Sequence, residues 1–277
     1  MKILLLAAIA ACAFGQAPSV DEIMQRVAAN QDSAQDLRKQ WIYNQKQVLR
    51  MIRGNGKLAR EERREYLILP KRKRISRELV KFEGKYENHG KYIPFDQPGY
   101  EYKGVDIDAN VINSLSEDLT NDKEAHDGIS PDLFPLTAKE QRKYDFQLVA
   151  RETYRERPVF RIKFQPKRHP LDGDTGSWKG EALVDAEEFQ PVSVHTSLAY
   201  GVPMAVKVLL GTNIKSLGFA VAYQKFADGV WFPVSYGGEF EVRAVFFYKR
   251  TISVSLVNSD FRRADVTTNI AFALEDK

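Results

Sequence analysis

The chain is 277 residues long and 43% hydrophobic, and its 41 basic residues nearly balance 37 acidic ones, which leaves a formal net charge of +4. This length and composition allow a hydrophobic core, in either one large β-rich domain or two ordinary domains. The small net charge does not fit a nucleic-acid-binding protein of the kind that concentrates lysine and arginine on one face.

The first fifteen residues have the pattern of an export signal. Lys2 supplies a positive charge, Ile3–Ala11 is a short apolar run, and Ala13 and Gly15 place small residues at positions −3 and −1 of a cleavage site before Gln16. No later segment has the roughly 20 consecutive apolar residues that a membrane-spanning helix needs. We therefore expect a protein of the periplasm or the outer-membrane surface, with full secretion as the alternative.

Cys12 is the only cysteine, and it lies inside the predicted signal. The sequence Ile9-Ala10-Ala11-Cys12 is similar to the bacterial lipobox, whose cysteine is lipidated and becomes the new N-terminus. The alternative is that Cys12 is a small apolar residue of a peptide that is removed. On either interpretation the mature chain, predicted as one β-rich domain over 16–277, has no disulfide.

A helix is predicted from about Val20 to Leu37. Ser19 and Glu22 form a capping box at its start, and apolar residues follow at helical spacing with polar residues between them. An amphipathic helix of this kind must cover an apolar surface.

Two charged strands, Trp41–Arg53 and Lys57–Leu69, are predicted around Gly54-Asn55-Gly56, because Asn-Gly between strand-like runs indicates a hairpin. A third strand is predicted over Arg74–Phe82. Between Arg50 and Lys81 twelve Lys and Arg stand against four Asp and Glu, a local net charge of +8.

This excess of basic residues has two interpretations. It is either the solvated outer face of antiparallel strands, or a docking surface for the anionic groups of a membrane surface or polyanion. The docking interpretation assigns the contact to five arginines: Arg60, Arg63, Arg64, Arg72 and Arg74.

An insertion is predicted at about 84–143, where glycine and proline are frequent and strand periodicity is lost. Apolar residues at helical spacing predict one short helix within it, formed around Ile107, Val111, Ile112, Leu115 and Leu119. Thr137 and Glu140 indicate a second helix start. Long insertions of this kind are commonly lids or binding loops.

From Tyr144 onward short strands are predicted in quick succession. They are Tyr144–Tyr154, Val159–Gln165, Lys179–Asp185, Gln190–Leu198, Gly218–Phe226, Val230–Tyr236, Glu239–Tyr248, Thr251–Asn258 and Arg262–Phe272. Strands at this spacing with turn residues between them indicate a β-sandwich or an open barrel. The apolar segment Pro203–Leu210 interrupts them, and we expect it to be buried or to cover an apolar ligand site.

No arrangement of residues indicates catalysis or a metal site, so no cofactor and no metal are predicted. The four histidines, His89, His126, His169 and His195, are scattered without metal-ligand spacing. Nucleophile elbows, phosphate loops and dinucleotide fingerprints are absent from the sequence. Glu181, Asp185 and Glu187 group around one hairpin, where ordinary surface carboxylates explain them.

Two segments resemble a known family. Trp178–Val192, a strand that ends in Asp185 and leads through a turn to Pro191, looks like a hairpin of the periplasmic carriers that sort outer-membrane lipoproteins. Asp228–Pro233, with the sequence DGVWFP, is similar to a second such element. The mature chain as a whole also resembles secreted proteins of uncharacterised function from Acidobacteria.

The carrier resemblance implies a strongly curved antiparallel sheet, an open half-barrel whose apolar concave face is covered by helices and holds acyl chains. It implies a non-enzymatic protein that binds lipid or lipoprotein acyl chains, with a role in outer-membrane lipoprotein sorting. The groove or lid positions expected on this basis are Trp41, Met204, Val208, Leu209, Phe219 and Trp231. The alternatives are an envelope scaffold with a basic docking face and a secreted hydrolase with an unrecognised site.

Overall fold

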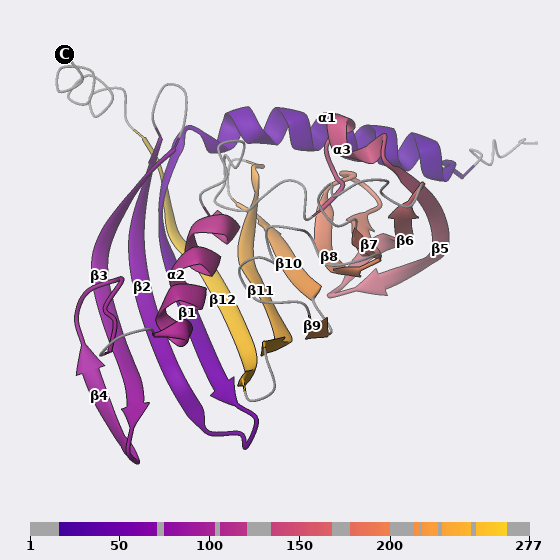
Figure 1. The fold of residues 1–277 in the computed structure, drawn as a ribbon. Helices are drawn as coiled ribbons and strands as arrows, with labels where there is room; N and C mark the ends of the chain where they lie inside the picture. Colours follow the sequence, from indigo (N-terminus) through magenta and orange to yellow (C-terminus); the bar gives the residue numbers. More distant parts are fainter. Residues whose placement is uncertain are drawn as a thin grey trace, which may run out of the picture.

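The structure is a computed structural model that describes residues 17–70, 75–102, 106–120, 134–167, 178–199, 213–215, 218–226, 229–244 and 248–264. Twelve strands form one antiparallel sheet, which curves strongly and is not closed (Figure 1). Its strand order is β4-β3-β2-β1-β12-β11-β10-β8-β7-β6-β5, with β9 paired to β11. The expected fold class, a mainly β protein built on an open curved sheet with few helices, is therefore confirmed.

The strands follow the sequence in a series of hairpins. They are β1 (Trp41–Arg53), β2 (Leu58–Pro70), β3 (Ile75–Asn88), β4 (Lys91–Phe95), β5 (Tyr144–Tyr154), β6 (Arg157–Pro166), β7 (Trp178–Asp185), β8 (Pro191–Leu198), β9 (Asn213–Lys215), β10 (Gly218–Lys225), β11 (Trp231–Ala244) and β12 (Tyr248–Arg263). The long-range pairing of β1 with β12 joins the N-terminal strands to the rest of the sheet. This pairing makes the sheet continuous although α2 and β5–β11 separate the two strands in sequence.

Helix α1 (Val20–Arg38) lies across one end of the curved sheet (Figure 1). Its predicted capping box is present, with Ser19 and Glu22 bonded reciprocally. Asn30 Nδ2 donates to the carbonyl oxygen of Glu188 at 2.8 Å, and Arg38 Nε donates to that of Trp231 at 2.7 Å. The helix thus covers an apolar surface, as the amphipathic pattern requires, and polar side chains fix it to two separate strand connections.

Two further helices lie in the predicted insertion. Helix α2 (Ile107–Thr120) lies in front of β1 and β2 on one face of the sheet, called the inner face below (Figure 1). Val111, Ile112 and Leu115 are buried on its sheet-facing side, as their spacing predicted. Helix α3 (Ala138–Gln141) is a single turn capped by the Thr137 hydroxyl.

Three clusters of buried hydrophobic side chains stabilise the sheet. The largest cluster lies on the inner face and combines residues of α1, α2, Phe134, Leu136 and the strands β1, β2, β5–β8 and β10–β12. A second cluster surrounds Phe232, and a third, smaller one surrounds Trp231. The main core is therefore the inner face of the sheet together with the elements that cover it.

Several predicted strands have different limits in the structure. The strand predicted to end at Phe82 continues to Asn88 and pairs with β4, because Gly84 has no side chain and the Phe95 ring packs directly over it. The turn between β5 and β6 is made by Arg155 and Glu156, both with positive φ. Strand β6 therefore begins at Arg157, two residues before the start that was predicted at Val159.

The C-terminal hairpin also differs from the prediction. Lys249 and Arg250 lie inside β12, paired with Arg243 and Val242 of β11, although a turn was expected there. The two strands expected on either side of residue 237 are one long β11, because Gly237 and Gly238 continue the ladder opposite β12 without a break. The predicted last strand overlaps the end of β12 at residues 262–263 and otherwise lies outside the described residues, as do Cys12 and the segment Pro203–Leu210.

Within the described ranges, no helix has both the length and the apolar composition to cross a membrane.

Gly180 of β7 marks a close approach of two strands. A Cβ at this position would overlap the carbonyl oxygen of His195 on β8 and lie 2.9 Å from the Phe164 ring. By contrast, a Cβ at Gly54 would meet only the flexible side chain of Lys249, at 3.3 Å.

We therefore expect Gly180→Ala to lower the free energy of unfolding by about 1–3 kcal/mol, because backbone atoms must move to admit a methyl group. The matched change Gly54→Ala should alter it by less than about 0.5 kcal/mol. Denaturant unfolding of both variants measures the difference. Equal stability of the two variants would contradict the close approach of β7 and β8.

Candidate ligand-binding face

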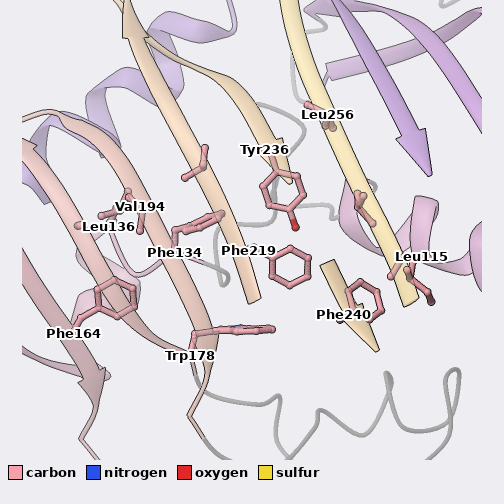
Figure 2. Close-up of a cluster of buried hydrophobic side chains, with 14 of the residues drawn as sticks. Leu115, Phe134, Leu136, Phe164, Trp178, Val194, Phe219, Tyr236, Phe240 and Leu256 are labelled. Atoms are coloured by element: carbon pink, nitrogen blue, oxygen red, sulfur yellow. The ribbon is translucent and has the colours of Figure 1, made fainter. Parts of the chain in front are cut away.

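The part of the inner face that runs across the sheet from β12 through β11, β10, β8 and β7 to β6 is lined by aromatic rings. Phe219 lies at the centre, with ring centroids 5.5 Å from Trp178, 5.4 Å from Tyr236 and 6.5 Å from Phe240. Figure 2 shows these rings side by side on the same face, with Phe164 farther along it. They form one continuous apolar surface, called the apolar half below.

Irregular backbone covers the centre of the apolar half. Phe134 stacks edge-on against Tyr236 at a centroid distance of 6.1 Å, and Leu136 belongs to the same cluster. These two residues precede the single turn of α3, and the Leu136 N–H donates to the Phe134 carbonyl oxygen at 2.7 Å. Among the described residues, the middle of the aromatic surface is therefore covered by irregular backbone rather than by a strand or a regular helix.

The inner face of β2 is charged. The two carboxylate oxygens of Glu62 each accept from a different arginine, Oε1 from Arg60 at 2.9 Å and Oε2 from Arg64 at 2.5 Å. The three side chains are 0%, 1% and 6% exposed, in the order Glu62, Arg60, Arg64. A buried carboxylate between two buried guanidinium groups is retained only where all three groups are bonded.

Helix α2 supplies the remaining partners of these arginines. Arg64 donates to Ser116 Oγ at 2.7 Å and to Asn113 Oδ1 at 2.9 Å, and Arg60 donates to Asp106 Oδ2 at 3.0 Å. The N-terminal turn of the helix is held in the same way, since Arg250 of β12 donates to both carboxylate oxygens of Asp108. Polar bonds therefore fix α2 to the inner faces of β2 and β12.

Tyr248 also bonds to Asp108, through its hydroxyl at 2.7 Å. Burial and this carboxylate raise the pKa of Tyr248 well above its ordinary value, so the phenol stays neutral and donates. The inner face of β1–β3, with the row Arg60, Glu62 and Arg64 at its centre, is called the polar half below.

Of the six residues predicted to line a groove or lid, only Phe219 lies in the aromatic surface of the apolar half. Trp41 belongs to the second cluster, and Trp231 belongs to the third, where its Nε1 donates to Glu188 at 3.1 Å. Met204, Val208 and Leu209 lie outside the described residues. Of the three predicted positions that the structure describes, Phe219 therefore lies apart from Trp41 and Trp231, and a groove or lid role of the other three stays a prediction.

The five arginines of the predicted docking surface are also separated. Arg60 and Arg64 are buried under α2, so these two side chains cannot contact an external anion. Arg63 points to the opposite face, 51% exposed, and its Nε lies 3.0 Å from Glu61 Oε1. Arg72 and Arg74 lie outside the described residues, and docking by them stays a prediction.

Two pockets open on the surface. One of about 520 Å³ lies over β5–β8 and is lined by Phe146 and Phe164 as well as by charged residues, among them Lys163, Lys179 and Glu181. The other, of about 300 Å³, lies beside the start of α2 and is lined by Arg53, Glu87, Asp108 and Arg250 among others. Their charged groups are mostly paired with one another, as in Arg250 with Asp108.

The carboxylates around the β7–β8 turn have structural partners. Asp185 is buried, bonds to Arg157 at 2.9 Å and accepts from the N–H groups of Glu187 and Glu188. Glu181 bonds to Arg161 at 3.0 Å. Among the residues that the structure describes, no three His, Cys, Asp or Glu side chains are grouped to hold a metal ion.

Comparison with known proteins identifies similar folds only among solved structures. No protein family matches the sequence, and no curated protein does. A LolA superfamily protein from Nitrosomonas europaea is 13% identical with a TM-score of 0.35, over 90% of this chain and 96% of its own. A Vibrio parahaemolyticus domain described as an outer membrane lipoprotein-sorting protein is 9% identical with a TM-score of 0.37, over 91% and 97%.

Lipovitellin, a structure described in terms of lipid–protein interactions, is 12% identical with a TM-score of 0.33, over 82% of this chain and 26% of its own. At these scores the function has to be argued from the residues of this chain.

Sequence reasoning missed most of the aromatic surface. Phe164, Trp178, Tyr236 and Phe240 all lie on one side of their strands, and the alternation in Trp178-x-Gly180-x-Ala182-x-Val184 marks that side in β7. The period-two pattern could have identified these residues strand by strand. It could not show that distant strands bring their rings together.

The charged row on β2 leads to a stability prediction. Glu62→Gln removes the charge between two buried arginines and should lower the free energy of unfolding by about 3–5 kcal/mol. Glu83→Gln is the matched control, because Glu83 pairs with Lys81 where both side chains are 56% exposed, and it should leave stability almost unchanged. Thermal unfolding of the two variants makes the comparison, and a Glu62→Gln protein as stable as the control would contradict the buried row.

Proposed function

We propose that this protein binds the acyl chain of a lipid or lipoprotein on the apolar half of the inner face, without chemical conversion of the ligand. The observation that carries the proposal is the continuous surface of touching rings from β7, β10 and β11, centred on Phe219. Aromatic side chains offer a large apolar area, which suits contact with a hydrocarbon chain.

The arrangement of the cover supports the same function. The middle of the aromatic surface is covered by Phe134 and Leu136, which lie on irregular backbone, while α2 is bound to the polar half by its own ion pairs. Segments without regular backbone bonding open at lower free-energy cost than strands or packed helices. An acyl chain can take the place of these two side chains without disturbing the sheet.

The energetics favour this exchange. Each methylene group that moves from water to an apolar surface contributes about 0.8 kcal/mol, so a dozen methylenes contribute about 10 kcal/mol. This amount exceeds the roughly 3–6 kcal/mol that burial of the two side chains, Phe134 and Leu136, contributes. Burial of a long acyl chain therefore contributes more free energy than burial of Phe134 and Leu136, and the chain can displace them.

The proposed setting is the bacterial envelope. The N-terminal pattern around Lys2, Ile3–Ala11 and Gly15 supports export, and a carrier that holds an acyl chain inside a covered sheet suits the aqueous periplasm. A role in the sorting of outer-membrane lipoproteins is the finer form of this proposal.

Two phenylalanines of β11 provide a matched test. Phe240 and Phe232 are each 1% exposed, but Phe240 lies in the apolar half and Phe232 in the second cluster. Replacement of either by Leu should lower the free energy of unfolding by a similar amount, about 1–3 kcal/mol. We expect only Phe240→Leu to weaken binding of a fluorescent 18-carbon fatty acid, by about tenfold, which corresponds to about 1.4 kcal/mol.

Native mass spectrometry of the wild-type protein, purified from envelope extracts, supplies an independent measurement. The proposal predicts that a lipid with an acyl chain co-purifies with the wild-type protein. The Phe240→Leu variant should lose this lipid, and the Phe232→Leu variant should retain it. The proposal fails if the wild-type protein neither carries a lipid nor binds the fatty acid, or if the two variants bind it equally.

A further inference from the structure

One hydroxyl group in the aromatic surface has no bonding partner. The Tyr236 side chain is 3% exposed, and its Oη has no hydrogen-bond partner among the described residues. Figure 2 shows this hydroxyl among the rings of the apolar half, pointing toward Phe219 and away from Leu256. Burial raises the pKa of Tyr236 well above its ordinary value, so the group is a neutral donor. A phenylalanine would fill the same space without burying an unbonded hydroxyl, which destabilises a folded chain.

A second unbonded donor lies nearby. Gln47 of β1 is 1% exposed, and its Nε2 has no partner among the described residues. The orientation of this amide is fixed, because the Ser116 hydroxyl accepts from Arg64 at 2.7 Å and therefore gives its own hydrogen to Gln47 Oε1, at 2.9 Å. The Nε2 group of Gln47, with its two N–H bonds, consequently points away from Ser116.

The strand register places both donors in one row. Tyr236 pairs with Leu256 of β12, and Leu256 pairs with Gln47 on its other side. Directly paired residues of antiparallel strands project from the same face, so the three side chains share the inner face. The two outer strands of the row are about 10 Å apart, two strand spacings. The row continues from Gln47 to Arg64, so it crosses from the apolar half into the polar half at Leu256.

We propose that Tyr236, assisted by Gln47, binds the carbonyl oxygen of the acyl ligand and so fixes the ligand's direction on the inner face. This inference rests on the proposed function and adds the chemical group recognised and its place at the boundary of the two halves. The hydrocarbon tail then lies along the aromatic surface toward β6, and the carboxylate or ester end lies at the Tyr236 hydroxyl.

The chemistry of the two groups selects this ligand end. A phenol O–H and an amide NH₂ donate, and an acyl carbonyl or carboxylate supplies the matching acceptor lone pairs. A plain hydrocarbon leaves both donors unbonded, and an ammonium group has no lone pair to offer them.

The test compares three 16-carbon probes delivered from cyclodextrin: hexadecanoate, its methyl ester and hexadecane. Calorimetric affinities are measured for the full-length mature protein and for Tyr236→Phe. Loss of the hydroxyl should weaken binding of hexadecanoate or the ester about five- to tenfold, as expected for one hydrogen bond, and leave hexadecane unchanged. The two oxygen-bearing probes separate a free fatty acid from an ester-linked chain as the preferred ligand.

Stability provides the second readout, with Tyr248→Phe as the control. The Tyr248 hydroxyl is bonded to Asp108, so its removal should lower the melting temperature without changing the preference among probes. Tyr236→Phe without ligand should keep or raise the melting temperature, because no bond is lost.

Three results would overturn the inference. One is a Tyr236→Phe protein that binds all probes with the wild-type affinities. This result would contradict the role of Tyr236 but not the proposed function. The second is a lower melting temperature of Tyr236→Phe without ligand, combined with unchanged probe preference. The third is a wild-type protein that binds none of the probes, which contradicts the proposed function as well.

Discussion

The buried carboxylate of Glu62 between Arg60 and Arg64 is the interaction on which the inner face depends. A sheet that stays open must have its concave side covered, and hydrophobic contact alone does not determine where a short helix such as α2 lies. The two arginines do, because their remaining N–H groups are bonded by Asp106, Asn113 and Ser116. Since an unpaired buried charge is strongly destabilising, α2 cannot slide along the strands without a large loss of free energy.

This constraint divides the inner face into two parts with different properties. Where the charged row holds α2, the polar half is rigidly covered, and the described residues that cover the apolar half are those of α1 at one end and Phe134 and Leu136 at its centre. The part of the face with the weaker cover is the part with the aromatic rings. A ligand with a long apolar tail and a polar end fits such a divided surface better than a wholly apolar or wholly polar one does.

Much of the fold could be predicted from the sequence, because local signals were strong. The capping box at Ser19, the Asn-Gly turn after Arg53 and the alternation in β7 each indicate one element without information from distant residues. The C-terminal turn was misplaced because Lys249 and Arg250 look like loop residues, whereas in the structure both continue the β11–β12 ladder and Arg250 bonds to Asp108 on the inner face.

The candidate site was harder to predict. Alternation required Arg63 and Arg64 to point oppositely, but both faces of β2 carry charges, so hydrophobicity could not show which side is inner. The touching rings come from strands far apart in sequence, and only the register unites them.

Photo-crosslinking with a diazirine-labelled 16-carbon fatty acid tests the central claim most directly, because it maps the ligand onto residues of the intact protein. With the label near the end of the chain, the account predicts crosslinks to Phe164, Trp178 or Phe219 on the inner face, abolished by unlabelled hexadecanoate. Crosslinks confined to the outer face, to the cluster around Phe232 or to no site that the unlabelled acid protects would contradict it.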